Sequence, residues 1–110
     1  MRIDSHHHLW DLDIAQRGWL AGEVLAPINR TFSMDDFYAE RASASIDKSI
    51  LVQTLPDYDE MKEFFNVAAN HDSVIGVVAW IDMSKSDCFE NLEKYLDLPV
   101  SNKTYDNAEL

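Results

Sequence analysis

The stretch VIGVVAWI, residues 74–81, decides the fold of this 110-residue chain. Every residue in it has an apolar side chain except Gly76, which has none, so a strand formed here would be apolar on both faces. Residues 50–52, Ile-Leu-Val, have the same character. Strands of this kind are typical of parallel sheets, in which both faces are covered. The two stretches therefore predict an α/β fold with a parallel sheet.

Amphipathic segments alternate with these apolar runs. We expect strands over residues 2–8, 47–54 and 74–81, and helices over residues 33–45, 57–70 and 84–96. The last helix is expected to bury Cys88, Phe89, Leu92, Tyr95 and Leu96. The order strand, helix, strand, helix, strand, helix predicts parallel strands joined by right-handed crossovers.

The first helix has a clear start, and a long loop precedes it. Ser33 is a candidate N-cap, with Asp36 three residues later as in a capping box. Residues 9–31 show no steady period and contain Gly18, Gly22 and Pro27. Loops of this length inside a compact domain are often functional.

Composition excludes several functions. The formal net charge of −11 argues against nucleic-acid backbone or an anionic membrane as partner, because such contacts need Lys and Arg. No stretch approaches the roughly 20 apolar residues of a membrane span. The first residues also lack the apolar run of a secretory signal, so we expect a cytoplasmic protein. Cys88 is the only cysteine, and the pattern favours a buried structural thiol over a reactive one.

The candidate site is the run DSHHH, residues 4–8. Alternate residues of a strand share a face, so His6 and His8 are expected to point one way and His7 the other. Two imidazoles in this arrangement can converge on one divalent metal, with zinc the best match. Asp4 is expected on their face, where it could orient a histidine.

Other interpretations of the histidines stay open. The run could be the remnant of a purification tag, or the histidines could be polar core residues with satisfied hydrogen bonds. The pair also supplies only two ligands, whereas a catalytic zinc site usually has three protein ligands and an open position.

Five stretches together carry a family resemblance. They are RIDSHHHLWD (2–11), WL (19–20), NRTFS (29–33), SILVQT (49–54) and GVVAWID (76–82). In this order they resemble the amidohydrolase-related family, in particular its branch of sugar-acid lactonases and pyrone-dicarboxylate lactonases. The likeness covers residues 1–97, which we interpret as the N-terminal part of the family's barrel.

The resemblance implies a partial (β/α)8 TIM-type barrel, with the first three β/α units and an active site at the carboxyl ends of the strands. It implies that His6 and His8 are metal ligands, or substrate contacts as in lactonases that need no metal. Water activated by the metal or by a carboxylate would attack a lactone or amide carbonyl. The substrate would be a small sugar-acid or dicarboxylate-type molecule.

The same resemblance suggests substrate-binding residues. Gln53 and Asp82, near the ends of the second and third strands, could line the barrel mouth, and strand-end capping is the alternative for both. Arg30 could meet a substrate carboxylate, or it could be a solvent-exposed loop residue. Trp10, Trp19 and Trp80 fit packing better than stacking on a sugar.

The chain also departs from the family. The family's later histidine, on a central strand, and its aspartate on a late strand have no counterpart in this chain, since His71 falls at a helix end. A complete barrel also needs about 250 residues. We therefore expect a truncated hydrolase that is inactive alone, with an irregular, non-family tail over residues 98–110. Its open sheet edge would invite self-association.

Two further hypotheses come from other classes. The chain could be a non-catalytic α/β module that binds a metal or a partner. A flavodoxin-like fold would need a phosphate-binding loop after the first strand, and Gly18, Gly22 and Gly76 are too dispersed to form one.

Overall fold

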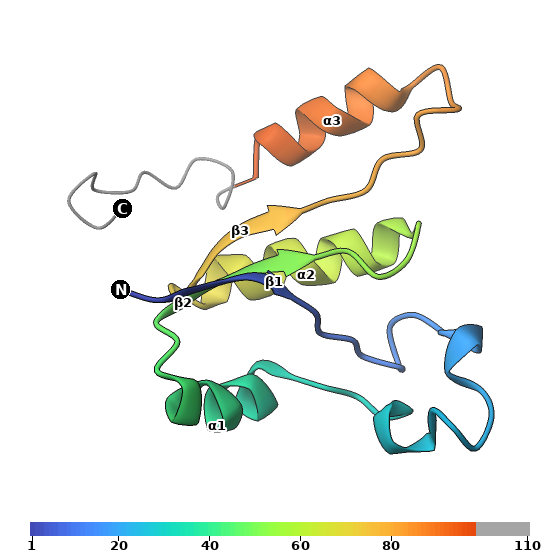
Figure 1. The fold of residues 1–110 in the computed structure, drawn as a ribbon. Helices are drawn as coiled ribbons and strands as arrows, with labels where there is room; N and C mark the ends of the chain where they lie inside the picture. Colours follow the sequence, from blue (N-terminus) through green and yellow to red (C-terminus); the bar gives the residue numbers. More distant parts are fainter. Residues whose placement is uncertain (99–110) are drawn as a thin grey trace.

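The computed structural model describes residues 1–98 and confirms the α/β architecture (Figure 1). Its three strands form one parallel sheet in the order β1-β2-β3. The elements along the chain are β1 (Ile3–His7), η1 (Gly18–Leu20), η2 (Ala26–Ile28), α1 (Met34–Ala44), β2 (Lys48–Val52), α2 (Tyr58–Asn70), β3 (Val74–Val78) and α3 (Cys88–Leu96). Beyond Leu98, the predicted tail lies outside the described residues.

Local caps set the starts of the first two helices. Ser33 and Asp36 form the predicted capping box, in which the Asp36 carboxylate accepts from the backbone N–H of Ser33 at 2.9 Å. Asp57 caps α2 by accepting from the N–H groups of Asp59 and Glu60. Each cap satisfies backbone donors that the first helical turn leaves without a partner.

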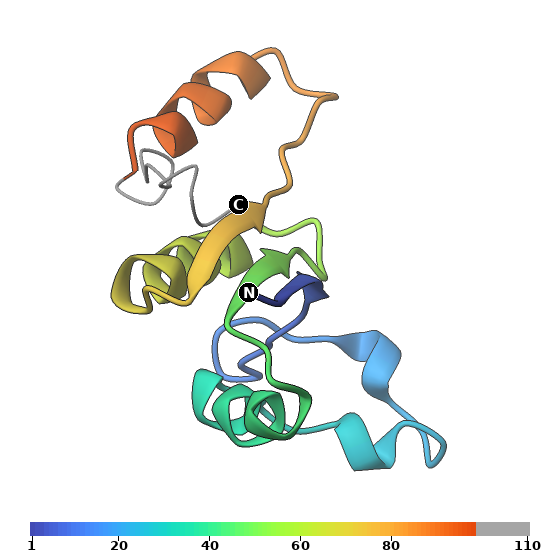
Figure 2. The same ribbon diagram turned by 60° about the vertical axis from the view of Figure 1, so that its left-hand side comes forward.

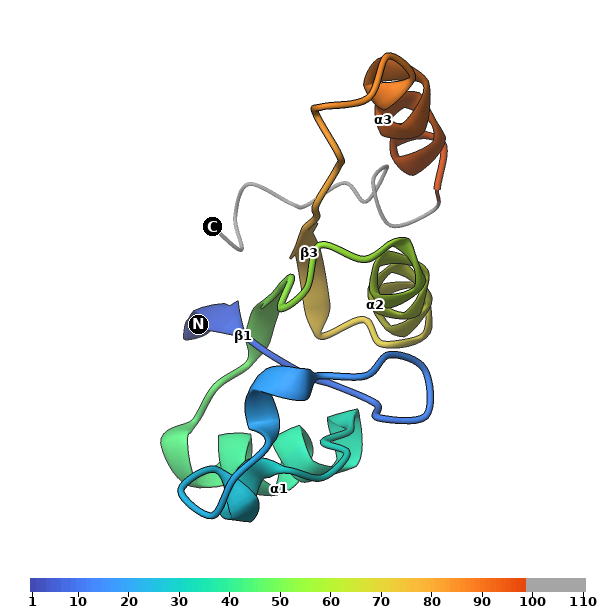
Figure 3. The same ribbon diagram turned by 90° about the vertical axis from the view of Figure 1, so that its right-hand side faces the viewer.

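The core lies between the sheet and the helices. Leu51 and Val74 from the strands pack with Met34 of α1 and with Phe64 and other residues of α2. Figure 3 shows α2 beside β3, with α3 set apart from the sheet. This apolar layer holds the strands in place against the helices, because burial of such side chains is the main favourable term in folding.

The opposite face of the sheet is not covered by residues 1–98. Ile50 pairs with Gly76 and Val52 with Val78 across β2 and β3, so these residues share that face. Ile50 and Val52 are half-buried, and Val78 is 51% exposed. The prediction of strands covered on both faces is therefore right for only one face of this sheet. This is the face that would look into a completed barrel.

Two boundaries differ from the prediction by three or more residues, because the segment after β3 turns early. β3 ends at Val78 instead of residue 81, and α3 begins at Cys88 instead of residue 84. Asp82 instead forms a turn, in which its carboxylate accepts from the N–H and hydroxyl of Ser84. A side chain that bonds the backbone two residues later favours a turn over a helix.

The prediction that α3 buries its apolar side chains is wrong. Phe89 is 75% exposed, Leu92 and Leu96 are exposed, and Cys88 is half-buried. Figures 1 and 2 show α3 set beyond β3 on an extended connection. Tyr95 is the residue that packs on α2, with its ring 5.0 Å from that of Phe65. An apolar stripe shows what a helix can bury, and burial also needs a facing partner.

The long loop is confirmed, and it is closed at its base. Trp10 and Phe32 form an antiparallel bridge, with N···O distances of 3.3 and 2.8 Å. The two short helices η1 and η2 lie within the loop. The loop extends on the side to which the strand arrows point (Figures 1 and 2). In the described part of the chain, no helix combines the length and apolar character of a membrane span.

Candidate functional site

His6 and His8 converge at the carboxyl end of β1. Their Nε2 atoms are 3.1 Å apart, and their rings meet edge to face with centroids at 4.8 Å. Two imidazole nitrogens bound to one tetrahedral zinc ion, each 2.0–2.1 Å from it, would lie about 3.3 Å apart. The spacing of the pair thus fits joint coordination of one divalent ion.

The backbone of β2 orients the second histidine. His8 Nδ1 lies 2.9 Å from the carbonyl oxygen of Val52, the last residue of β2. A carbonyl can only accept, so this contact assigns the proton to Nδ1 and leaves the lone pair on Nε2. A hydrogen bond of this kind fixes the tautomer and ring direction that a metal ligand needs.

His7 points to the other side of the sheet, as predicted. Its ring is buried, stacks on Phe37 of α1 and lies 3.4 Å from Ser49 Oγ. Burial lowers the pKa of His7 to about 4, and the nearby negative charge of Asp4 partly opposes this shift. His7 is therefore a neutral packing residue at physiological pH.

Asp4 differs from its predicted role. The pairing register of β1 shifts between Asp4 and His7, which interrupts the strict alternation of faces. Its carboxylate accepts from the backbone N–H of His6 at 3.0 Å, instead of contacting an imidazole. Asp4 therefore fixes the backbone of the histidine run.

A catalytic zinc site needs more than this pair. Among residues 1–98, no group of three His, Cys, Asp or Glu side chains is placed to hold a metal ion. His6 and His8 supply two nitrogen ligands of the right kind and spacing, while zinc enzymes use three protein ligands. The residues present fit one part of a metal centre.

Arg30 and His8 line the same hollow. A groove of about 300 Å³ lies between the end of β1 and α1, and both residues line it. The Arg30 guanidinium lies 3.7 Å from the ring centre of Phe32 and 3.3 Å from Asp36 Oδ1. Hydrogen bonds from Ser33, and secondarily from Arg30, lower the pKa of Asp36. The Arg30 side chain is 53% exposed, so it can reach a ligand in the groove.

Gln53 and Asp82 follow the ends of β2 and β3. The Gln53 N–H donates to the carbonyl of Val78 at 3.0 Å. The Asp82 carboxylate accepts from Ser84, which lowers its pKa. Within residues 1–98, no hydrogen bond or ion pair joins either residue to His6 or His8. The place of both residues at the site remains a prediction.

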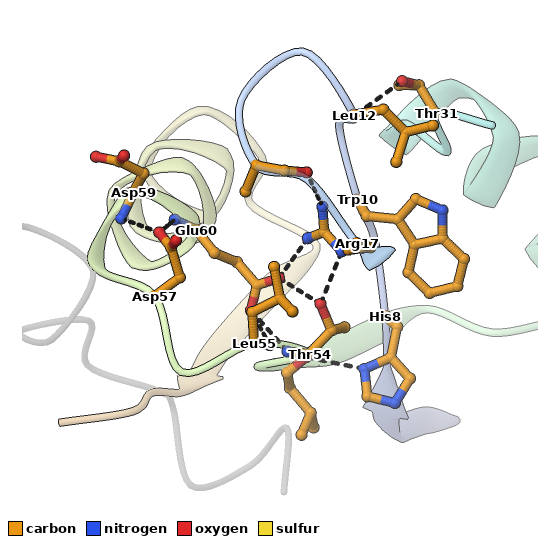
Figure 4. Close-up of polar contacts among 12 residues, drawn as sticks. His8, Trp10, Leu12, Arg17, Thr31, Thr54, Leu55, Asp57, Asp59 and Glu60 are labelled. Atoms are coloured by element: carbon orange, nitrogen blue, oxygen red, sulfur yellow. Dashed lines mark hydrogen bonds and ion pairs between the residues drawn. The ribbon is translucent and has the colours of Figure 1, made fainter. Parts of the chain in front are cut away.

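Sequence reasoning missed a buried charged cluster beside the pair. Arg17, from the long loop, forms an ion pair with Glu60 of α2, and both side chains are fully buried. Arg17 also donates to Thr54 Oγ1 at 3.0 Å. Figure 4 shows this cluster next to Trp10 and His8. No sequence signal pointed to this pair, because Arg17 stands between Gln16 and Gly18 in the loop and residue spacing does not pair it with Glu60.

The chain resembles known proteins in sequence and in structure. No family model matches the chain. It is 29% identical over 86 residues to an L-fucono-1,5-lactonase from Burkholderia ambifaria, covering 78% of the chain and 29% of that relative. It is 25% identical over 95 residues to an L-fucono-1,5-lactonase from Burkholderia multivorans, covering 86% and 32%.

Two crystal structures of a Burkholderia multivorans amidohydrolase match the fold. One, with bound HEPES, has a TM-score of 0.79 and 25% identity, and the match covers 88% of this chain and 33% of the crystallised chain. The other, with bound zinc, has a TM-score of 0.75 and 24% identity, covering 86% and 33%. The chain thus spans about a third of the length of the relatives it matches.

The sheet and its neighbours define a class of protein. The three parallel β/α units are part of a TIM-type (β/α) barrel, as predicted. Within that class, the chain is similar to a crystallised amidohydrolase and to proteins named L-fucono-1,5-lactonase. The predicted resemblance to the lactonase branch of the amidohydrolase-related family is confirmed.

Proposed function

We propose that the chain forms part of the active site of a hydrolase that opens the lactone of a small sugar acid or dicarboxylate-type molecule, or cleaves an amide of one. The observation that carries this proposal is the 3.1 Å approach of His6 Nε2 to His8 Nε2, with His8 held by the Val52 carbonyl. The lactonase-named relatives support the substrate class. Residues 1–97 would be the N-terminal part of the barrel, in a cytoplasmic enzyme.

In this proposal, His6 and His8 hold a divalent ion, best zinc, through their Nε2 atoms. An ion bound here would act as a Lewis acid on a substrate carbonyl. In the metal-free alternative, the same two nitrogens contact the substrate directly. In both cases, the Nδ1–H bond of His8 keeps its Nε2 lone pair directed at the ligand.

Substrate binding would involve the groove and the rim. The Arg30 guanidinium can pair with a substrate carboxylate, and its stacking on Phe32 limits the orientations of its planar donor group. Gln53 and Asp82 would contact the substrate from the ends of β2 and β3. The acidic chain would bind neither nucleic acid nor membrane.

Metal titration tests the proposal directly. We expect the chain to bind Zn(II) in isothermal titration calorimetry, and His6→Ala and His8→Ala each to weaken binding about tenfold or more. His71→Ala is the matched control, because this histidine bonds Tyr38 away from the pair and should leave affinity unchanged. Equal affinity in wild type and in the His6→Ala/His8→Ala double variant would refute the metal role.

Activity tests the second half of the proposal. The chain alone should show no lactone or amide hydrolysis above background. Residues 1–98 bring together two ligands, whereas a catalytic zinc site needs three. Turnover that disappears in His6→Ala would show that this chain suffices for catalysis.

A further inference from the structure

The buried ion pair of Arg17 and Glu60 joins the long loop to α2. Arg17 Nη2 donates to Glu60 Oε2, and Arg17 Nη1 donates to the carbonyl of Ala15 at 3.0 Å. Both side chains are fully buried, and Figure 4 shows the contacts between them. The third nitrogen of the guanidinium, Nε, donates to Thr54 Oγ1, so all three nitrogens of Arg17 donate a hydrogen bond.

The Glu60 carboxylate also fixes the segment that follows β2. Its Oε1 accepts from the N–H groups of Thr54 at 2.6 Å and Leu55 at 3.0 Å. Its Oε2 accepts from the Thr54 hydroxyl. Hydrogen bonds to an ionised acceptor are shorter and stronger than neutral ones, so this carboxylate sets the path of the backbone at residues 54 and 55.

That segment begins two residues after the group that orients His8. The Val52 carbonyl accepts the Nδ1–H of His8, and Thr54 is held by Glu60. The N–H of Gln53, in the same peptide unit as the Val52 carbonyl, donates to the Val78 carbonyl at 3.0 Å, and Glu60 holds the next peptide unit. A change in the path of the backbone at Thr54 would tilt the Val52 carbonyl relative to His8, because the two peptide units share the Cα of Gln53.

We propose that Arg17 and Glu60 are positioning residues for His8, acting through the Val52 carbonyl. This inference rests on the proposed role of the histidine pair. Replacing a buried ion pair by apolar residues of similar volume is often neutral or stabilising, so stability alone is a weak reason for this one. Apolar side chains could fill the space, but they could not accept hydrogen bonds from the N–H groups of Thr54 and Leu55.

Two double variants separate positioning from packing. Arg17→Met/Glu60→Gln removes both charges and keeps a side-chain carbonyl that can accept from Thr54 and Leu55. Arg17→Met/Glu60→Met removes the charges and the acceptor while keeping apolar volume. Cooperative urea unfolding confirms that each is folded before the histidines are measured.

The readout is the His8 tautomer, measured on the 110-residue chain by long-range ¹H–¹⁵N NMR of the imidazoles. We expect wild type and Arg17→Met/Glu60→Gln to keep the proton on Nδ1, and Arg17→Met/Glu60→Met to show a mixture of both tautomers. Zn(II) affinity should fall about tenfold in the Met/Met variant and stay within about twofold in the Met/Gln variant. An unchanged His8 tautomer and affinity in a folded Met/Met variant would overturn the proposal.

A third variant covers the case in which the Met/Met chain does not fold. Thr54→Val keeps the side-chain shape and removes the hydroxyl that contacts both Arg17 and Glu60. A smaller shift toward mixed tautomers is expected, and none in the folded variant overturns the inference. If wild type binds no zinc, the proposed metal role fails, and the tautomer comparison still decides this inference.

Discussion

The imidazole of His7 stacks on the ring of Phe37, with centroids 3.8 Å apart and planes inclined by 23°. This contact joins β1 to α1 on the covered side of the sheet. His6 and His8 are exposed on the other side, where their Nε2 atoms meet. Three consecutive histidines thus have two roles, packing for the middle one and the candidate site for its neighbours.

We expect His7→Ala to lower the free energy of unfolding by about 1–3 kcal/mol, because it removes a buried, stacked ring. His6→Ala is the matched control in the same run, and it should change stability by less than about 0.5 kcal/mol, since its ring is exposed. Urea unfolding followed by tryptophan fluorescence measures both. A loss in His6→Ala equal to that in His7→Ala would contradict this division of roles.

Glu63 should make stability depend on pH. Burial, followed by the negative charge of Asp11, raises its pKa from 4.5 to about 7, and Arg17 opposes the shift. Its Oε2 is buried and has no hydrogen-bond partner among residues 1–98. The folded state therefore holds the proton more tightly than the unfolded state. The stabilisation is complete below pH 4.5 and is lost as the pH rises through 7.

Glu63→Gln should remove this dependence, since an amide does not titrate. Relative to wild type, the variant should gain on the order of 2 kcal/mol between pH 5 and pH 8, after a discount for partial exposure. His7 works in the opposite direction, because its lowered pKa costs stability as the pH falls from 6.5 toward 4. The contribution of His7 is the same in both proteins, so it cancels when the free energy of unfolding of the wild type is subtracted from that of the variant at each pH. A difference that is constant from pH 5 to 8 would show that Glu63 does not titrate in this range.

The main features of fold and site follow from local patterns. The apolar runs and helical stripes predicted the order of elements, because each pattern is set by residues close in sequence. The convergence of His6 and His8 followed from the two-residue period of a strand. The capping box at Ser33 followed from residue type and spacing alone.

Other features depend on contacts between distant segments. The register shift that changes the role of Asp4 arises in the pairing of β1 with β2. The pairing of Arg17 with Glu60 joins residues 43 positions apart. The exposure of Phe89 depends on what faces α3 in space. Periodicity within one element carries no information about any of the three.

The uncovered sheet face predicts self-association of the chain. Val78 lies on β3, at the edge of the sheet, and is 51% exposed beside Val52. The apolar side chains that residues 1–98 leave exposed on this face offer apolar area to a second copy. We expect the apparent mass in analytical ultracentrifugation to rise with concentration, and Val78→Lys to reduce this rise.

Val24→Lys provides the matched control, because this valine is 91% exposed in the long loop, away from the sheet. Both variants add the same positive charge to an acidic chain, so a general effect of net charge would act on them equally. Burial of a lysine at a strand edge is costly, and edge lysines commonly block pairing between sheets.

We therefore expect Val78→Lys to shift the association to higher concentration by about tenfold, corresponding to about 1.4 kcal/mol, with Val24→Lys close to wild type. Equal shifts in the two variants would assign the association to charge instead of to the open face, and a wild-type chain that stays monomeric at all concentrations would refute the prediction.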